Sequence, residues 1–259
     1  MSGDVSFFLS NGICLATLHN SPRRNAVSHS MWEKLYDFAT GPKPAFGRVV
    51  VLRGEGTKAF SAGADVEEFR HGRADAAGAK AYDDLVESTC QAIERIPVPT
   101  IALIHGACMG AGASLAASCD IRVTSDDAFF AVPAAKLGLG YDPRGIDRLS
   151  RVFGDNLARQ ILFTASRLPA MRAYEAGAVY RISTAEAVDA DVQKLAEDIS
   201  DNAPLTIEAA KAALNAIRTH DTKMRDEAER RYRVADASAD YVEGRAAFAE
   251  KRRPLFRGV

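Results

Sequence analysis

Alternating runs of apolar residues divide the first 150 residues of the chain into short strands and helices. Two apolar runs flank Asn11-Gly12, a dipeptide typical of a β-hairpin turn. Nearly continuous runs of β-branched or aliphatic residues are typical of buried parallel strands. The segments between these runs have the apolar spacing of helices. This alternation predicts a right-handed α/β layering rather than separate sheets. The predicted strands are 5–10, 13–20, 48–54 and 100–106, and the predicted helices are 30–40 and 83–96, with a helix running into a strand over 112–125.

Helix 30–40 has Ser30 and Glu33 at capping-box spacing, which predicts its start at Ser30. From about Asp155 onward the pattern changes to helix only. We therefore predict an α/β core over residues 1–200 and a helical C-terminal region over 201–259. The helical segments after Asp155 are 155–165, 169–179, 184–203, 204–220, 222–238 and 240–256.

Composition narrows the class of protein. Of 259 residues, 47% are hydrophobic and 26% charged, as in globular proteins, and the net charge of −1 favours neither nucleic acid nor an acidic membrane surface as a partner. The four cysteines lack paired or metal-like spacing, which predicts reduced, buried thiols and no metal site. No apolar stretch has membrane-spanning length and no export signal is visible, so we expect a cytoplasmic protein.

Two loops rich in small residues carry the candidate chemistry. Residues 61–64 (SAGA) follow a buried strand, and residues 106–115 (GACMGAGASL) join a strand to a helix. Small side chains let backbone N–H groups approach a ligand, where they can hold an anion or a developing oxyanion. Tight packing of strand against helix is the alternative interpretation of either loop.

Ser114 suggests a second kind of chemistry. Residues 112–116 (GASLA) are one residue short of a nucleophile elbow, which would make Ser114 a nucleophile with a downstream Asp and His220. The missing last glycine and the helical position of Ser114 argue against this reading. The five histidines form no metal-like cluster, and His105, at the end of a buried strand, is expected to be structural.

Taken together, the two loops resemble the crotonase superfamily, the enoyl-CoA hydratase/isomerase family. Matching blocks cover nearly the whole chain, from SPRRNAVS at 21–28 and AFSAGADVEEF at 59–69 to EGRAAFAEKRRPLF at 243–256. The resemblance implies an α/β spiral of ββα turns that ends in a helical trimerisation region. It also implies binding of acyl-CoA thioesters, in trimers or dimers of trimers, with coenzyme A entering as part of the substrate and no separate cofactor.

The same resemblance assigns candidate site residues. A thioester carbonyl would accept hydrogen bonds from the backbone N–H groups of Ala62 and Ala111, and these bonds would strengthen as an enolate forms. The C-terminal positions Tyr232 and Lys251 would contact the ligand, in some members from a neighbouring subunit. The other matching positions that would line the coenzyme A channel or the acyl pocket are Arg24, Ala26, Gly63, Ala64, Asp65, Val66, Gly110, Ser114, Pro133, Ala134 and Leu137.

The sequence departs from the family at its acid–base positions. Hydratases of the family use two glutamates, and these positions are Ser114 and Ala134 here. Neither side chain can carry protons as a glutamate does at neutral pH. Hydration by the two-glutamate route is therefore not expected, and the single-glutamate isomerase route fails at Ala134. Isomerisation, decarboxylation or hydrolysis through another group is favoured.

Asp142 falls where other branches of the superfamily place a catalytic carboxylate, and Tyr141 precedes it. A buried Asp142 with a raised pKa could act as a base, although Arg144 would oppose that shift or bind a carboxylate of the acyl group. The alternative is that Asp142 caps a Tyr-Asp-Pro turn. A non-catalytic acyl-CoA-binding protein of the same fold is the alternative function.

Overall fold

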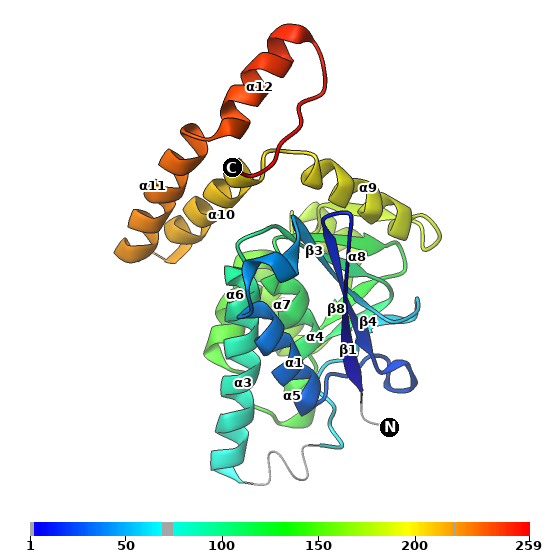
Figure 1. Cartoon of the computed structure of the whole chain (residues 1–259). Coiled ribbons are helices and arrows are strands. Elements are labelled where there is room, and N and C mark those ends of the chain that lie inside the picture. The colour runs from blue at the N-terminus through cyan, green and yellow to red at the C-terminus, as the bar shows by residue number, and fades with distance from the viewer. Residues whose placement is uncertain (1–2, 69–74, 220) are drawn as a thin grey trace.

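The computed structural model describes residues 3–68, 75–219 and 221–259, and these residues form two β-sheets with helices packed around them (Figure 1). The alternation along the chain predicts an α/β layering rather than separate sheets, and the two sheets show that this part of the prediction is wrong. The larger sheet has the order β1 (Asp4–Ser10), β2 (Ile13–His19), β3 (Val49–Gly54), β5 (Thr100–Ile104), β7 (Ile121–Ser125) and β10 (Arg181–Ser183). The smaller sheet has the order β4 (Ala59–Ser61), β6 (Ala107–Met109), β8 (Phe129–Ala131) and β9 (Leu168–Pro169).

A strand–strand–helix unit recurs along the first half of the chain. The first strand of each unit joins the larger sheet, the second joins the smaller sheet, and neighbouring units pair in parallel. This is the spiral of ββα turns that the family resemblance implied. The units end in the helices α3 (Ala76–Arg95), α4 (Ala111–Ser118) and α5 (Ala134–Leu137).

The N-terminal hairpin forms as predicted, with β1 and β2 antiparallel around Asn11 and Gly12. Helix α1 (His29–Ala39) begins earlier than the capping-box prediction placed it. Its N-cap is Ser28, whose hydroxyl accepts the N–H of Met31 at 3.3 Å, and the Ser30 hydroxyl bonds that of Ser28 at 3.0 Å. Because Ser28 has the extended backbone and the side-chain hydrogen bond of an N-cap, the prediction of Ser30 as the cap is wrong.

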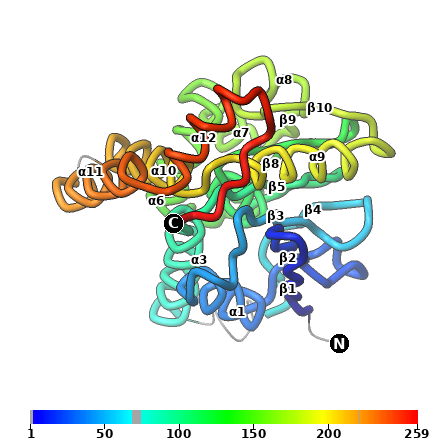
Figure 2. Tube along the Cα trace, turned by 45° about the horizontal axis from the view of Figure 1, so that its top comes forward, coloured from blue at the N-terminus to red at the C-terminus, as the bar shows by residue number. Residues whose placement is uncertain are grey.

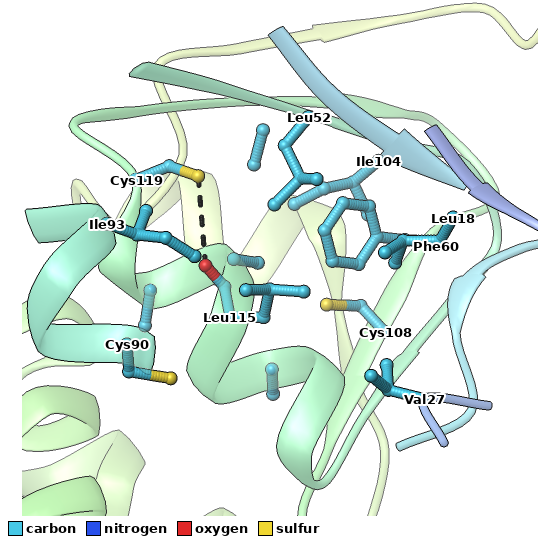
Figure 3. Packing of buried hydrophobic residues seen from close by; sticks show 14 of the residues in the cluster. Leu18, Val27, Leu52, Phe60, Cys90, Ile93, Ile104, Cys108, Leu115 and Cys119 are labelled. Carbon is cyan, nitrogen blue, oxygen red and sulfur yellow. Dashed lines mark hydrogen bonds between the residues drawn. The ribbon is translucent and has the colours of Figure 1, made fainter. Parts of the chain in front are cut away.

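Alternate residues of the larger sheet face opposite layers, as strand geometry requires. Val49 and Val51 pack with Val192 of α9 (Val188–Ser200), whereas Val50 and Leu52 face the core shared with α1, α3 and α4. Figure 2 shows α9 lying along the outer face of the sheet. All four cysteines are free and buried, as predicted, and Figure 3 shows three of them among the aliphatic core residues.

The second half of the chain is mostly helical, with α6 (Pro143–Phe153), α7 (Asp155–Thr164), α8 (Ala170–Glu175), α9 and three C-terminal helices. The prediction of helix alone after Asp155 is wrong, because β9 and β10 extend the two sheets. The helices α10 (Pro204–Thr219), α11 (Thr222–Asp236) and α12 (Ala239–Glu250) project from the core (Figures 1 and 2). No helix among the described residues is long and apolar enough to cross a membrane.

Candidate active site

A pocket of about 120 Å³ opens between α3, the start of α4 and the segment around α5. The two small-residue loops and the segment after β8 meet there, and most predicted site residues lie in its wall. Those that line it are Ala62, Gly63, Ala64, Val66, Gly110, Ala111, Ser114, Pro133, Ala134, Leu137, Tyr141 and Asp142. Residues that the prediction omitted are Tyr82, Asp83, Val86, Glu87, Val132, Leu139 and Gly140.

Glycines let the two loops touch backbone to backbone. Gly63 has φ +100°, and a Cβ there would lie 2.9 Å from the carbonyl oxygen of Met109 and 3.5 Å from the nitrogen of Ala111. Gly110 has φ +51°, and its Cβ would be 3.9 Å from Cα of Gly63. Side chains at these positions would be strained or would separate the loops. The glycines therefore bring the neighbouring backbone donors of both loops to one wall of the pocket.

The backbone donor predicted in the first loop is already bonded within the protein. The N–H of Ala62 donates to the carbonyl of Arg24 at 2.9 Å, so it is not available to a ligand. The bridge between Val27 and Ala64 uses the carbonyl of Gly63 and the N–H of Asp65, which turns the N–H of Ala64 away from Val27.

One N–H group from each loop is free, among the described residues, at the point where the two loops meet. Within the described part of the chain, the N–H groups of Ala64 and Ala111 have no hydrogen-bond partner. Ala111 is the first residue of α4, where a helical N–H has no acceptor in its own helix. Both residues line the pocket. Ala64 thus replaces Ala62 as the available partner of Ala111.

No acid stands at the two positions where hydratases carry glutamates. Ser114 is buried inside α4, and its hydroxyl lies 2.9 Å from that of Tyr141, which also donates to the carbonyl of Gly110 at 3.2 Å. Burial raises the pKa of Tyr141, so it stays protonated at neutral pH. Ala134, the first residue of α5, presents only a methyl group.

Asp142 is the N-cap of α6, as the turn-cap alternative held. Its carboxylate accepts the backbone N–H of Arg144 at 2.8 Å and is held by the Arg144 guanidinium at 2.9 and 2.7 Å. This guanidinium lowers the pKa of Asp142, which is the opposing effect of Arg144 that the sequence analysis raised. Arg144 is also 2.9 Å from Asp84 and does not line the pocket, which argues against its predicted contact with an acyl carboxylate.

Glu87 of α3 is a carboxylate in the pocket wall that the sequence analysis missed. It is only 3% exposed, and its Oε2 lies 2.9 Å from Nη1 of buried Arg148. Burial raises the pKa of Glu87 despite this guanidinium. Glu87, Cys90 and Glu94 are spaced at i, i+3 and i+7, so they share the buried face of α3. That spacing was the available signal.

The remaining predicted residues do not line the pocket. Asp65 is buried and held by Arg23 at 2.7 Å, Ala26 is buried, and the carbonyl of Arg24 supports the loop at Ala62. Tyr232 lies on α11, and Lys251 directly follows α12. Both helices are on the opposite side of the chain from α5 (Figure 1). His220, the proposed partner of a Ser114 nucleophile, lies outside the described residues.

His105 is 2% exposed and bonds Asp189 at 2.7 Å, in keeping with a structural role. No group of three or more potential metal-ligating side chains occurs within residues 3–68, 75–219 and 221–259. The polar groups in the pocket wall are backbone donors, the hydroxyls of Tyr82, Ser114 and Tyr141, and the carboxylates of Asp83, Glu87 and Asp142.

Known proteins have sequences similar to that of this chain over nearly its whole length. Residues 9–259 match the family described as enoyl-CoA hydratase/isomerase. A Mycobacterium leprae protein named "Probable enoyl-CoA hydratase" is 36% identical over 96% of this chain and 97% of its own length. The methylmalonyl-CoA decarboxylase of Escherichia coli is 33% identical over 96% of this chain and 95% of its own length.

A crystal structure of an enoyl-CoA hydratase/carnithine racemase from Magnetospirillum magneticum has the same fold. It superposes with a TM-score of 0.90 at 33% identity, covering 98% of this chain and 96% of that one. Matches in sequence and in structure thus extend over essentially the whole chain. The chain belongs to the enoyl-CoA hydratase/isomerase family, the crotonase superfamily.

Proposed function

We propose that this protein binds acyl-CoA thioesters in the pocket and stabilises their enolates through the N–H groups of Ala64 and Ala111. The observation that carries the proposal is the pair of unoccupied donors at the contact of the two glycine loops. Preorganised donors gain strength as negative charge develops on a carbonyl oxygen, and a buried site amplifies the gain. Family membership supports a thioester as the ligand that supplies this carbonyl.

The reaction proposed is isomerisation, decarboxylation or thioester hydrolysis rather than water addition by two glutamates. Ser114 is bonded to Tyr141, and Ala134 has no polar group, so neither can hold and activate a water molecule as a glutamate does. The carboxylates in the pocket wall are those of Asp83, Glu87 and Asp142. Decarboxylation needs mainly the enolate stabilisation, and a relative with that activity is 33% identical.

The test is incubation of the purified protein with a mixed panel of acyl-CoA thioesters, followed by mass spectrometry. Loss of CO2, release of free coenzyme A or a change of double-bond position supports the proposal. Fast hydration of crotonyl-CoA would contradict the argument from Ser114 and Ala134. Binding without turnover over the whole panel would favour the non-catalytic acyl-CoA-binding protein, the alternative raised by the missing glutamates.

Assembly through the C-terminal helices is part of the same proposal. Helix α12 exposes Val242 at 66% and Phe248 at 87%, and Tyr232 lines a groove of about 790 Å³ between α10 and α11. Apolar surface of this kind favours burial against other copies of the chain, in a trimer or a dimer of trimers. Light scattering coupled to size-exclusion chromatography tests this, and a monomer at micromolar concentration would contradict it.

A further inference from the structure

Glu87 is a buried carboxylate in the pocket wall, and within the described part of the chain Arg148 is its one ion-pair partner. Its Oε2 is 2.9 Å from Nη1 of Arg148, but the two atoms are not aligned for a hydrogen bond, and both lack a hydrogen-bond partner among the described residues. The same arginine bonds Glu94 at 3.0 Å, and Glu94 is also held by Arg151 and Arg218 at 3.2 and 3.1 Å. Arg148 therefore makes its hydrogen bond to Glu94, which does not line the pocket, whereas its contact with Glu87 is an ion pair alone.

The other carboxylate oxygen of Glu87, the ring of Tyr141 and Oγ of Ser114 all lie around Gly145. A Cβ on Gly145 would be 3.0 Å from Oε1 of Glu87, 3.0 Å from the ring of Tyr141 and 3.6 Å from Oγ of Ser114. Glycine at 145 thus leaves these groups room to converge. Ser114 occupies one of the two glutamate positions of hydratases, so Glu87 brings a carboxylate from a different helix to the same end of the pocket.

Asp142 is less suited to take a proton from a carbon acid. Two bonds from the Arg144 guanidinium and one from its backbone N–H already hold the Asp142 carboxylate, and they lower its pKa. A carboxylate stabilised in this way is a weaker base. Desolvation acts in the opposite direction on Glu87 and raises its pKa. A base poised closer to neutral pH is the more effective proton carrier.

We propose that Glu87 is the catalytic base of this pocket, an assignment that rests on the function proposed above. Its carboxylate takes a proton from the carbon next to the thioester carbonyl, and the electron pair of the broken C–H bond moves into the carbonyl. The resulting enolate oxygen is held by the N–H groups of Ala64 and Ala111. Protonated Glu87 then returns the proton to the same carbon or, in an unsaturated acyl chain, to a conjugated one, so no further reactant is needed.

The test is exchange of the α-hydrogens of butyryl-CoA in D2O, followed by mass spectrometry, with binding measured separately by calorimetry. We expect wild-type protein to incorporate deuterium. The Glu87→Gln variant should bind butyryl-CoA but exchange about 10²–10⁴-fold more slowly, the usual contribution of a general base. Glu94→Gln is the matched control, since Glu94 also pairs with Arg148 but does not line the pocket. It should keep the wild-type exchange rate.

The outcomes distinguish failure of the proposed enolate function from failure of the role assigned to Glu87. Wild-type protein that binds butyryl-CoA without exchange overturns the enolate function and the role of Glu87 together. If Glu87→Gln exchanges at the wild-type rate, only the role of Glu87 is overturned. The same holds if Asp142→Asn loses exchange while Glu87→Gln keeps it. If Glu87→Gln does not fold, Glu87→Asp serves instead, because it keeps the charge but withdraws it by one methylene. Slow exchange with intact binding supports the assignment, and an unchanged rate contradicts it.

Discussion

Replacing Arg148 by methionine tests how charge is balanced beneath the pocket. Arg148 is 1% exposed and pairs with Glu87 and Glu94 at 2.9 and 3.0 Å. After the change, Glu94 keeps Arg151 and Arg218, whereas Glu87 loses its one ion-pair partner among the described residues. The penalty should therefore come mainly from an uncompensated charge on Glu87.

The expected loss is that of a broken buried ion pair, about 3–5 kcal/mol in the free energy of unfolding. For a chain of this size each kcal/mol corresponds to roughly 2–4 °C in Tm, so Tm should fall by roughly 10 °C. Adding Glu87→Gln removes the unpaired charge and should recover roughly 1–3 kcal/mol, a coupling typical of residues in contact. Adding Glu94→Gln instead should recover nothing, because Glu94 still has two arginine partners.

Stability should also depend on pH in Arg148→Met. Burial already raises the folded-state pKa of Glu87, and Asp142 adds to this while Arg148 and Arg144 oppose it. Without Arg148 the pKa rises further above the unfolded value of about 4.3. A group with a raised folded-state pKa binds its proton more tightly when folded, so stability falls as pH rises above the unfolded value. Urea unfolding at pH 5.5 and 7.5 should show the larger loss at pH 7.5. Equal recovery by the two glutamine changes, or the larger loss at pH 5.5, would refute this reasoning.

Three further changes probe the loops around the pocket. Ala111→Pro places a residue suited to the first turn of α4 but removes the backbone N–H, so it should slow turnover of any substrate found in the acyl-CoA panel by about 10²–10³-fold. Ala111→Gly keeps the N–H and should keep the wild-type rate. Similar rates in the two variants would argue against the oxyanion role of this N–H. Gly112→Ala would place a Cβ 2.7 Å from Cβ and 3.0 Å from the carbonyl oxygen of Ser61. It should cost about 1–3 kcal/mol in denaturant unfolding, and an unchanged midpoint would be inconsistent with the tight loop contact. Asp142→Ala removes the cap of α6 and its bonds to Arg144, and should cost about 0.5–2 kcal/mol, which an unaltered Tm would disprove.

Local patterns in the sequence predicted the hairpin and the buried strands, because each depends on residues close together in the chain. The ββα order was implied by the family resemblance. The second sheet was not predicted, since β4, β6 and β8 have three residues each and carry no clear alternation. The donor in the first loop was misplaced by two residues. Which N–H is free there depends on the bridge to Val27, a contact over long sequence separation.

The surroundings of the two carboxylates Asp142 and Glu87 likewise depend on tertiary contacts to different extents. Asp142 and Arg144 are two residues apart, so their pairing and the turn cap could be anticipated. Glu87 looked like an ordinary charged helix position, although its spacing with Cys90 and Glu94 indicated the buried face. Its place in the pocket depends on Arg148, 61 positions further along, and on the absence of a side chain at Gly145.

The most direct test of the central claim is the infrared carbonyl stretch of butyryl-CoA labelled with ¹³C at the thioester carbon. Two backbone donors, Ala64 and Ala111, should polarise the bound carbonyl and lower its frequency relative to free ligand. In Ala111→Pro, with one donor removed, the shift should be clearly smaller at saturating ligand. A carbonyl frequency in the wild-type complex equal to that of free butyryl-CoA would contradict the account.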